Sequence, residues 1–259
     1  MTVGSAGAIN AVLKAILDPG DEVIVPMPCF SEYQFFIANH AGIMVPVDTD
    51  AAFALDIGAL RAAITPRTRA IILNSPHNPT GRVLERYELE LLAAVCRRHD
   101  LIAVTDEVYE HLVYAGTHVP LATLPGMAER TVTTSSLGKT HSLTGWKIGF
   151  VCAAPPLLRV AAKVHQFLTF TTAPNLQVAV AYGLGKPADY FLDMRKELAR
   201  SRDRLTAGLE RIGFPVLKSQ GTYFLTVDLS PLGLNETDEA FCKRIVTDYK
   251  VAAIPVSAF

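Results

Sequence analysis

The sequence predicts an α/β fold, in which a mostly parallel sheet has helices on both faces and is followed by part of a smaller α+β domain. Short runs rich in Val and Ile, bounded by turn residues, alternate with longer segments of helical periodicity. Such alternation is typical of parallel strands joined by covering helices. Half of the 259 residues are hydrophobic, which is enough to bury a large core, and the chain is longer than a usual single domain.

The elements of the expected sheet follow one another in a regular order. Strands are predicted for residues 22–26, 43–47, 70–74, 101–105, 131–135 and 148–152. Helices are predicted for residues 6–17, 31–40, 84–99 and 156–167. The first helix follows a Gly/Ala/Ser turn, and no strand is predicted before it.

The pattern changes near residue 187. Residues 189–213 have the period of a long charged amphipathic helix closed by Gly213. Residues 221–229 and 251–256 resemble strands, and a helix is predicted to start near Thr237. We therefore expect a large domain over residues 1–187, and a connecting helix with a partial small domain over residues 188–259. Because the chain opens in a turn and stops after an apparent strand, we expect a piece of a longer protein.

Composition and missing motifs argue against several classes of function. The net charge of −1 gives no electrostatic reason to expect nucleic acid or an acidic membrane as partner. No apolar run approaches the roughly 20 residues of a membrane span, and the start does not resemble a signal peptide. The four cysteines are scattered and the histidines lack metal-ligand spacing, so we expect no disulfide framework, no metal site and a cytoplasmic location. Neither a dinucleotide-binding nor a P-loop motif is present.

Polar residues gather where the predicted strands end, which is where open α/β sheets bind ligands. Asn78 follows the third strand, Asp106 and Tyr109 follow the fourth, and Lys139 and Lys147 flank the last two. Each is ordinary alone: an Asp after a strand is usually a helix cap, NPTG is a good turn, and a loop lysine is usually solvated.

Six motifs in one order change this interpretation. They are G-[SA]-x-G, P-x-F-x-x-Y, N-x-P-x-N-P-T-G, D-E-x-Y, S-x-x-K and G-W-K-x-G, and they begin at Gly4, Pro28, Asn74, Asp106, Ser136 and Gly145. The chain resembles class I/II aminotransferases of the aspartate aminotransferase fold, which use pyridoxal 5′-phosphate (PLP). SSLGKTHSLTGWKIGF, KVHQFLTF and VAAIPVSAF resemble the kynurenine, glutamine and methionine aminotransferase branch most.

The resemblance assigns the reactive end of the cofactor to four residues. Lys139 would hold PLP as a Schiff base and then move a proton between the substrate Cα and the cofactor C4′. Asp106 would keep the pyridine nitrogen protonated, since a fixed carboxylate stabilises the charged form. Asn78 and Tyr109 would donate hydrogen bonds to the phenolic oxygen.

The resemblance also assigns the phosphate of the cofactor to a helix start and two side chains. Ser5 and Ala6 would offer backbone N–H groups, Ser136 a hydroxyl, and Lys147 a positive charge. Many relatives carry Arg in place of Lys147, and the kynurenine-type branch shares the lysine.

Two phenylalanines complete the expected site. Phe30 would stack on the pyridine ring. Phe170 would reach across a homodimer interface into the partner's site, although a place in the core is an equal alternative.

The function implied is transamination between a 2-oxo acid and an amino acid with a neutral, aromatic or sulfur-containing side chain. The family's carboxylate-binding arginine would lie beyond Phe259, so we expect this chain alone to bind the cofactor with weak or no transamination. Two alternatives remain open: a PLP-dependent β-lyase on the same scaffold, and a non-catalytic PLP-sensing domain.

Overall fold

The computed structural model describes residues 1–259 and contains one seven-stranded sheet, with strand order β1-β7-β6-β5-β4-β2-β3. Its strands are β1 (Thr2–Val3), β2 (Glu22–Met27), β3 (Ile43–Asp48), β4 (Thr68–Asn74), β5 (Ile102–Asp106), β6 (Thr131–Ser136) and β7 (Ile148–Ala153). Strands β2 to β6 pair in parallel, whereas β7 runs antiparallel to both β6 and β1. The predicted mostly parallel sheet is confirmed.

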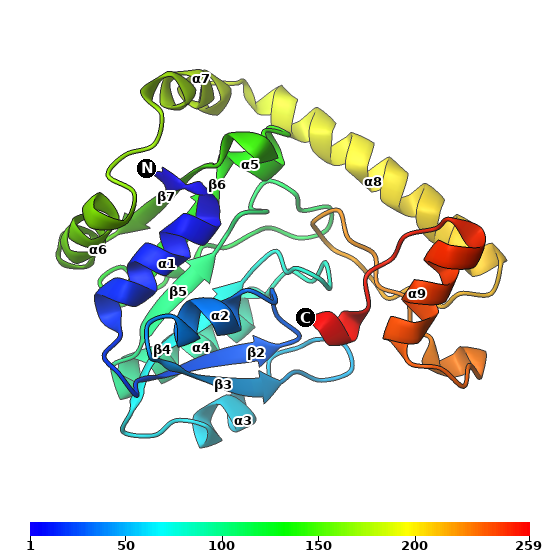
Figure 1. The fold of residues 1–259 in the computed structure, drawn as a ribbon, viewed down its shortest axis with the longest axis horizontal. Helices are drawn as coiled ribbons and strands as arrows, with labels where there is room; N and C mark the ends of the chain where they lie inside the picture. Colours follow the sequence, from blue (N-terminus) through cyan, green and yellow to red (C-terminus); the bar gives the residue numbers. More distant parts are fainter.

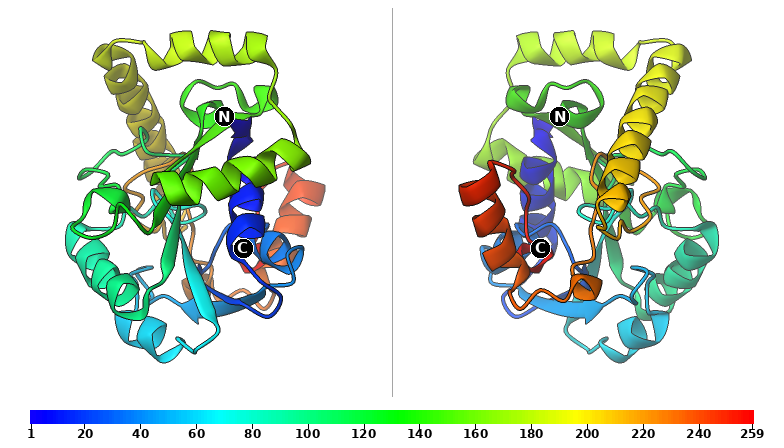
Figure 2. Two further views of the ribbon diagram at one scale, coloured as in Figure 1. Left: turned by 90° about the vertical axis from the view of Figure 1, so that its left-hand side faces the viewer. Right: turned by 90° about the vertical axis from the view of Figure 1, so that its right-hand side faces the viewer.

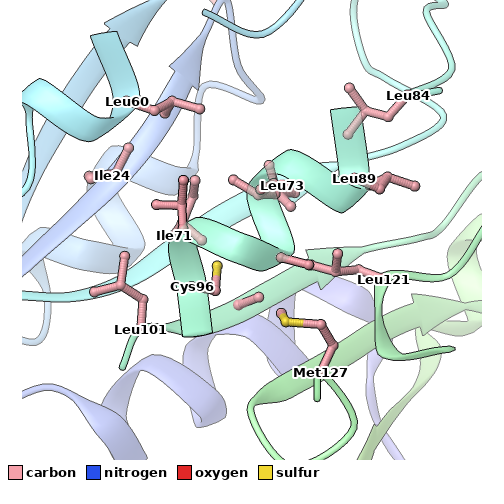
Figure 3. Packing of buried hydrophobic residues seen from close by; sticks show 14 of the residues in the cluster. Ile24, Leu60, Ile71, Leu73, Leu84, Leu89, Cys96, Leu101, Leu121 and Met127 are labelled. Atoms are coloured by element: carbon pink, nitrogen blue, oxygen red, sulfur yellow. The ribbon is translucent and has the colours of Figure 1, made fainter. Parts of the chain in front are cut away.

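Helices cover both faces of this sheet, as predicted (Figure 1). One face packs against α1 (Gly4–Ile16), α2 (Tyr33–Ala38) and α6 (Pro155–Leu168), and the other against α3 (Ile57–Ala62) and α4 (Arg86–His99). Successive side chains of a strand point to opposite faces. Val23 and Val25 of β2 therefore join the core beneath α1, whereas Ile24 joins the core beneath α4, which Figure 3 shows.

The rest of the chain is helical or irregular. It contains α5 (Leu137–Thr140), α7 (Pro174–Leu184), α8 (Ala188–Arg211) and α9 (Asp238–Tyr249), and the 3₁₀ helices Leu121–Thr123, Thr144–Trp146, Ser230–Leu232 and Val256–Ala258. Helix α8 runs along one side of the molecule and links α7 to the region of α9 (Figures 1 and 2). No helix is both long and apolar enough to cross a membrane.

All predicted helices and all six strands before residue 187 form within two residues of their expected bounds. Thr237 caps α9, and its hydroxyl accepts a hydrogen bond of 3.2 Å from the N–H of Ala240. Helices α3, α5 and α7 were not predicted. Asp56 caps α3, because its carboxylate accepts a hydrogen bond of 2.9 Å from the N–H of Ala59. The six residues of α3 are too few to show a helical pattern in the sequence.

Three expectations about strands were wrong. A strand, β1, does precede the first helix, but its two residues are too few to form a pattern. Residues 251–256 form no strand, because no neighbouring strand pairs with them. Residues 221–229 form only two isolated bridges, Val113–Gly221 and Val216–Val227.

The segment 219–226 packs instead against loops of the large part of the chain. The backbone N–H groups of Gln220 and Gly221 both donate to the carbonyl of Gly81 at 2.8 Å. The N–H of Thr222 donates to the carbonyl of Leu112 at 2.8 Å. The division into domains at residue 187 stays a proposal, and this segment belongs structurally with the large part.

Two adjacent leucines of α4 test the core. Leu92 is fully buried and Leu91 is 43% exposed. We expect Leu92→Ala to lower the free energy of unfolding by about 2–5 kcal/mol, because it leaves a cavity. Leu91→Ala should cost less than about 1 kcal/mol. Urea unfolding followed by circular dichroism measures both, and equal losses would contradict the assigned packing.

Candidate functional site

The ends of several strands meet at one edge of the sheet. The carboxyl ends of β4, β5 and β6 share this edge because the three strands are parallel. Strand β1 also ends there and β7 starts there, since β7 is antiparallel to both of its neighbours. Among the residues that the sequence assigned to the site, Asp106 and Ser136 end strands at this edge, and all others except Phe170 lie within a few residues of a strand end. Phe170 lies in the loop between α6 and α7.

Asp106 is the buried acid at this edge, only 4% exposed at the end of β5. Its carboxylate accepts hydrogen bonds from the Tyr33 hydroxyl at 2.9 Å and from the N–H of Val108 at 3.3 Å. Burial raises the pKa of the carboxyl to about 6, while these two hydrogen bonds and the nearby charge of Lys139 oppose the rise. Asp106 is thus ionised at neutral pH in a place that disfavours its charge.

Tyr33 is a site residue to which the sequence assigned no role. It is 1% exposed, and burial raises the pKa of its hydroxyl well above the usual range, so that the hydroxyl stays a donor toward Asp106. Its ring packs edge-on against Phe30, with 5.5 Å between centroids. Tyr33 thus links Phe30 to Asp106. In the sequence, the only indication of its role was its position in the motif P-x-F-x-x-Y.

Two asparagines of the N-x-P-x-N motif connect the loop after β4 to β5. The Asn74 side-chain N–H donates to the backbone carbonyl of Asp106 at 2.7 Å. The side-chain oxygen of Asn74 accepts from the backbone N–H of Asn78 at 2.6 Å. The side-chain Oδ1 of Asn78 is buried without a hydrogen-bond partner. Since buried polar atoms are nearly always paired, this amide is ready to meet a ligand.

Lys139 lies between two tyrosine rings. It is half-buried on the short helix α5, with its Nζ 5.9 Å from the ring centroid of Tyr109 and 5.7 Å from that of Tyr223. The structure therefore brings Lys139, Tyr109 and Asp106 close together. Tyr223, from the distant segment 219–226, was not among the predicted site residues.

A second group of site residues surrounds the start of β7. Ser136 of β6 and Thr2 of β1 both pair with Gly149, which holds the three strands in one row. A Cβ on Gly149 would collide with the backbone of Gly4 and of Ser135, so only glycine permits this approach. The start of α1 therefore lies beside the end of β6.

The polar groups of this row could hold an anion. Ser5 and Ala6 occupy the first turn of α1, whose N-terminus has no side-chain cap. Ser136 caps α5, and its hydroxyl donates to the carbonyl of Ile148 at 3.2 Å. Lys147 is exposed and forms no ion pair.

Comparisons with known proteins agree with this arrangement. The chain belongs to the family Aminotransferase class I and II, which it matches over residues 1–259. It is 44% identical to a probable N-succinyldiaminopimelate aminotransferase, DapC, of Mycobacterium tuberculosis, covering 100% of this chain and 66% of that protein. It is 37% identical to kynurenine–oxoglutarate transaminase 3 of Mus musculus, covering 100% of this chain and 63% of that enzyme.

A solved structure confirms the fold. The Escherichia coli protein YbdL, described as having a methionine aminotransferase function, matches with a TM-score of 0.95 and 34% identity, over 99% of this chain and 67% of that chain. The present chain spans about two thirds of the length of the curated relatives it matches.

The burial of Asp106 predicts a pH-dependent cost to the fold. Because folding raises the pKa of this carboxyl to about 6, the stability it contributes is greatest at low pH and falls as the pH rises from about 4 to about 6. Without cofactor, we expect Asp106→Asn to be more stable than the wild type above pH 6, by about 1–3 kcal/mol. The gain should vanish near pH 4.

Urea unfolding at a series of pH values measures this difference. Asp18→Asn, at an exposed carboxyl, should show no such dependence. A difference between Asp106→Asn and wild type that stays constant across pH would contradict the assigned burial of the charge.

Proposed function

We propose that this protein binds PLP and uses it for transamination between an amino acid and a 2-oxo acid. The observation that carries the proposal is the ionised carboxylate of Asp106, buried at the same edge as Lys139 in a chain of the aminotransferase family. A buried carboxylate is strongly stabilised by a cationic partner. The protonated pyridine nitrogen of PLP is such a partner, and Lys139 is an amine able to react with the aldehyde.

Polar groups without protein partners support the fit of this cofactor. The side-chain Oδ1 of Asn78 is buried without a partner, and the amide oxygen and nitrogen can exchange places by rotation. The start of α1 has no side-chain cap on its backbone N–H groups, and Lys147 forms no ion pair. The amide of Asn78 suits the phenolic oxygen of PLP, and the start of α1 and Lys147 suit its phosphate.

When bound, PLP supplies an aldehyde that condenses with amines and a ring that withdraws electrons. The residues of this chain bind, orient and move protons around it. Lys139 Nζ would take up and move the proton that leaves the substrate Cα. Asp106 would accept a hydrogen bond from the pyridine N–H and keep that proton in place. Asn78 and Tyr109 would donate to the phenolic oxygen.

The remaining residues hold and shield the cofactor. The N–H groups of Ser5 and Ala6, the Ser136 hydroxyl and the charge of Lys147 would bind the phosphate. Phe30, which packs edge-on against Tyr33, would cover one face of the ring and exclude water.

We propose amino acids with neutral, aromatic or sulfur-containing side chains as the substrates. The names of the mouse kynurenine transaminase and of the bacterial methionine aminotransferase support this class. The name of the M. tuberculosis relative, at 44% identity, adds N-succinyldiaminopimelate to the substrates that an assay should include. The four cysteines are free, which suits a reducing compartment, and we propose a cytoplasmic location.

We also propose that the protein is a homodimer. Large apolar side chains are exposed on α6, on α7 and on the loop between them, a surface called here the α6–α7 face. They are Leu158, Val160, Phe167, Leu168, Phe170, Val178, Tyr182 and Leu184. Phe170 is 75% exposed and so is not a core residue of this chain, contrary to one alternative. An apolar face of this extent is typical of a subunit interface.

A spectrum tests the cofactor proposal. With added PLP we expect a cofactor absorbance band that disappears in Lys139→Ala, because no amine is left to bond to the aldehyde. Lys139→Arg is the matched control for charge, and it should also lack the band. Adding methionine should convert the wild-type band to that of the aminated cofactor. Identical spectra for wild type and Lys139→Ala would contradict the proposal.

Sedimentation tests the dimer. Val178→Glu places a charge on the α6–α7 face, where Val178 is 73% exposed. We expect its dimer dissociation constant to rise at least about tenfold, because a buried unpaired charge costs more than 1.4 kcal/mol. Val246→Glu, on α9 and 47% exposed, is the control and should not change the mass. A wild-type monomer at all concentrations would refute the dimer.

A further inference from the structure

Tyr223 stands beside the reactive lysine although it comes from a distant part of the chain. Its ring meets that of Tyr109 edge-on, with 5.5 Å between centroids and an interplanar angle of 83°. Its hydroxyl oxygen lies 3.5 Å from the hydroxyl oxygen of Tyr109, and either atom can donate. Tyr109 is 2% exposed and its hydroxyl has no other protein partner, whereas Tyr223 is 47% exposed.

The backbone before Tyr223 is held in an unusual conformation. Thr222 is fully buried and has a φ of 64°, a left-handed value that a β-branched residue rarely adopts. Its N–H is bonded to Leu112, its carbonyl accepts from the Tyr114 hydroxyl, and its own hydroxyl accepts from the N–H of Phe224 at 3.1 Å. Such strain persists only where the surroundings enforce it, and it concentrates at functional sites. Here it fixes the direction of Tyr223.

When an anion lies near the Tyr109 hydroxyl, only one direction is possible for the hydrogen bond between Tyr109 and Tyr223. A tyrosine hydroxyl has one hydrogen to donate and lone pairs with which to accept. If the hydrogen of Tyr109 points to a negatively charged oxygen, its oxygen can accept only from Tyr223. Hydrogen-bonded hydroxyls polarise one another, so that a donor which also accepts becomes a better donor. The 3.5 Å separation is long, and such contacts shorten when a ligand binds.

We propose that Tyr223 is a positioning residue, which donates to the Tyr109 hydroxyl and so directs the Tyr109 hydrogen toward the phenolic oxygen of PLP. This inference rests on the proposed function, and it deepens that function by extending the cofactor's hydrogen-bond chain into segment 219–226. A better donor to the phenolic oxygen stabilises its negative charge. The nitrogen contributed by Lys139 then loses its proton at a lower pH.

The test is the pH midpoint of the absorbance change of Lys139-bound PLP, in the wild type, Tyr223→Phe, Tyr109→Phe and the double variant. We expect Tyr223→Phe to raise the midpoint by about half a pH unit and Tyr109→Phe by about one unit or more. The double variant should match Tyr109→Phe, because Tyr223 acts through Tyr109. Tyr87→Phe, at a 54% exposed tyrosine, is the control and should leave the midpoint unchanged.

The outcomes separate this inference from the proposed function. A normal Lys139-dependent band whose midpoint does not move in Tyr223→Phe overturns the inference and leaves the proposed function standing. Additive shifts in the double variant also overturn it, since Tyr223 would then act independently of Tyr109. Absence of any Lys139-dependent band in the wild type overturns both. Circular dichroism of each variant verifies that the fold is intact.

Discussion

The buried charge of Asp106 is the constraint on which the arrangement of the site depends. A carboxylate that is 4% exposed is unfavourable unless its surroundings compensate for lost water. Here a tyrosine hydroxyl, a backbone N–H and the charge of Lys139 do so only in part, and the pKa stays raised. A group that costs the apo protein stability and is nevertheless held so firmly is typical of functional sites rather than of structural ones.

The neighbouring elements follow from that placement. Asn74, Asp106 and Thr134 form one row across β4, β5 and β6. A second row, across β1, β7 and β6, contains Thr2, Gly149 and Ser136. The first row positions the Asp106 carboxylate and the Asn74 amide, and the second row positions the start of α1. One edge of the sheet thus holds, at fixed places, a carboxylate suited to binding a cation and a helix N-terminus suited to binding an anion.

Much of this could be predicted from the sequence, because the central strands β2, β4 and β5 are buried on both faces and so appear as continuous apolar runs rich in Val and Ile. Their order along the chain then placed Asp106 and Lys139 at one edge. The roles of individual residues came from resemblance to a family, since motif spacing alone does not distinguish a cofactor ligand from a helix cap.

What could not be predicted depends on contacts between distant segments. Residues 221–229 alternate like a strand, but their backbone groups bond to two loops of the large part, and no local signal names those partners. Tyr33 and Tyr223 were missed for the same reason. Each acts through a hydroxyl whose partner lies far away in sequence, 73 residues from Tyr33 and 114 from Tyr223.

The attachment of segment 219–226 also decides which parts of the molecule can move independently. Its bonds to Gly81 and Leu112 make it travel with the sheet, although the chain on either side leads to α8 and α9. A rotation of α9 must therefore bend the backbone at residues 227–237. Tyr223 would keep its place beside Lys139 during such a motion.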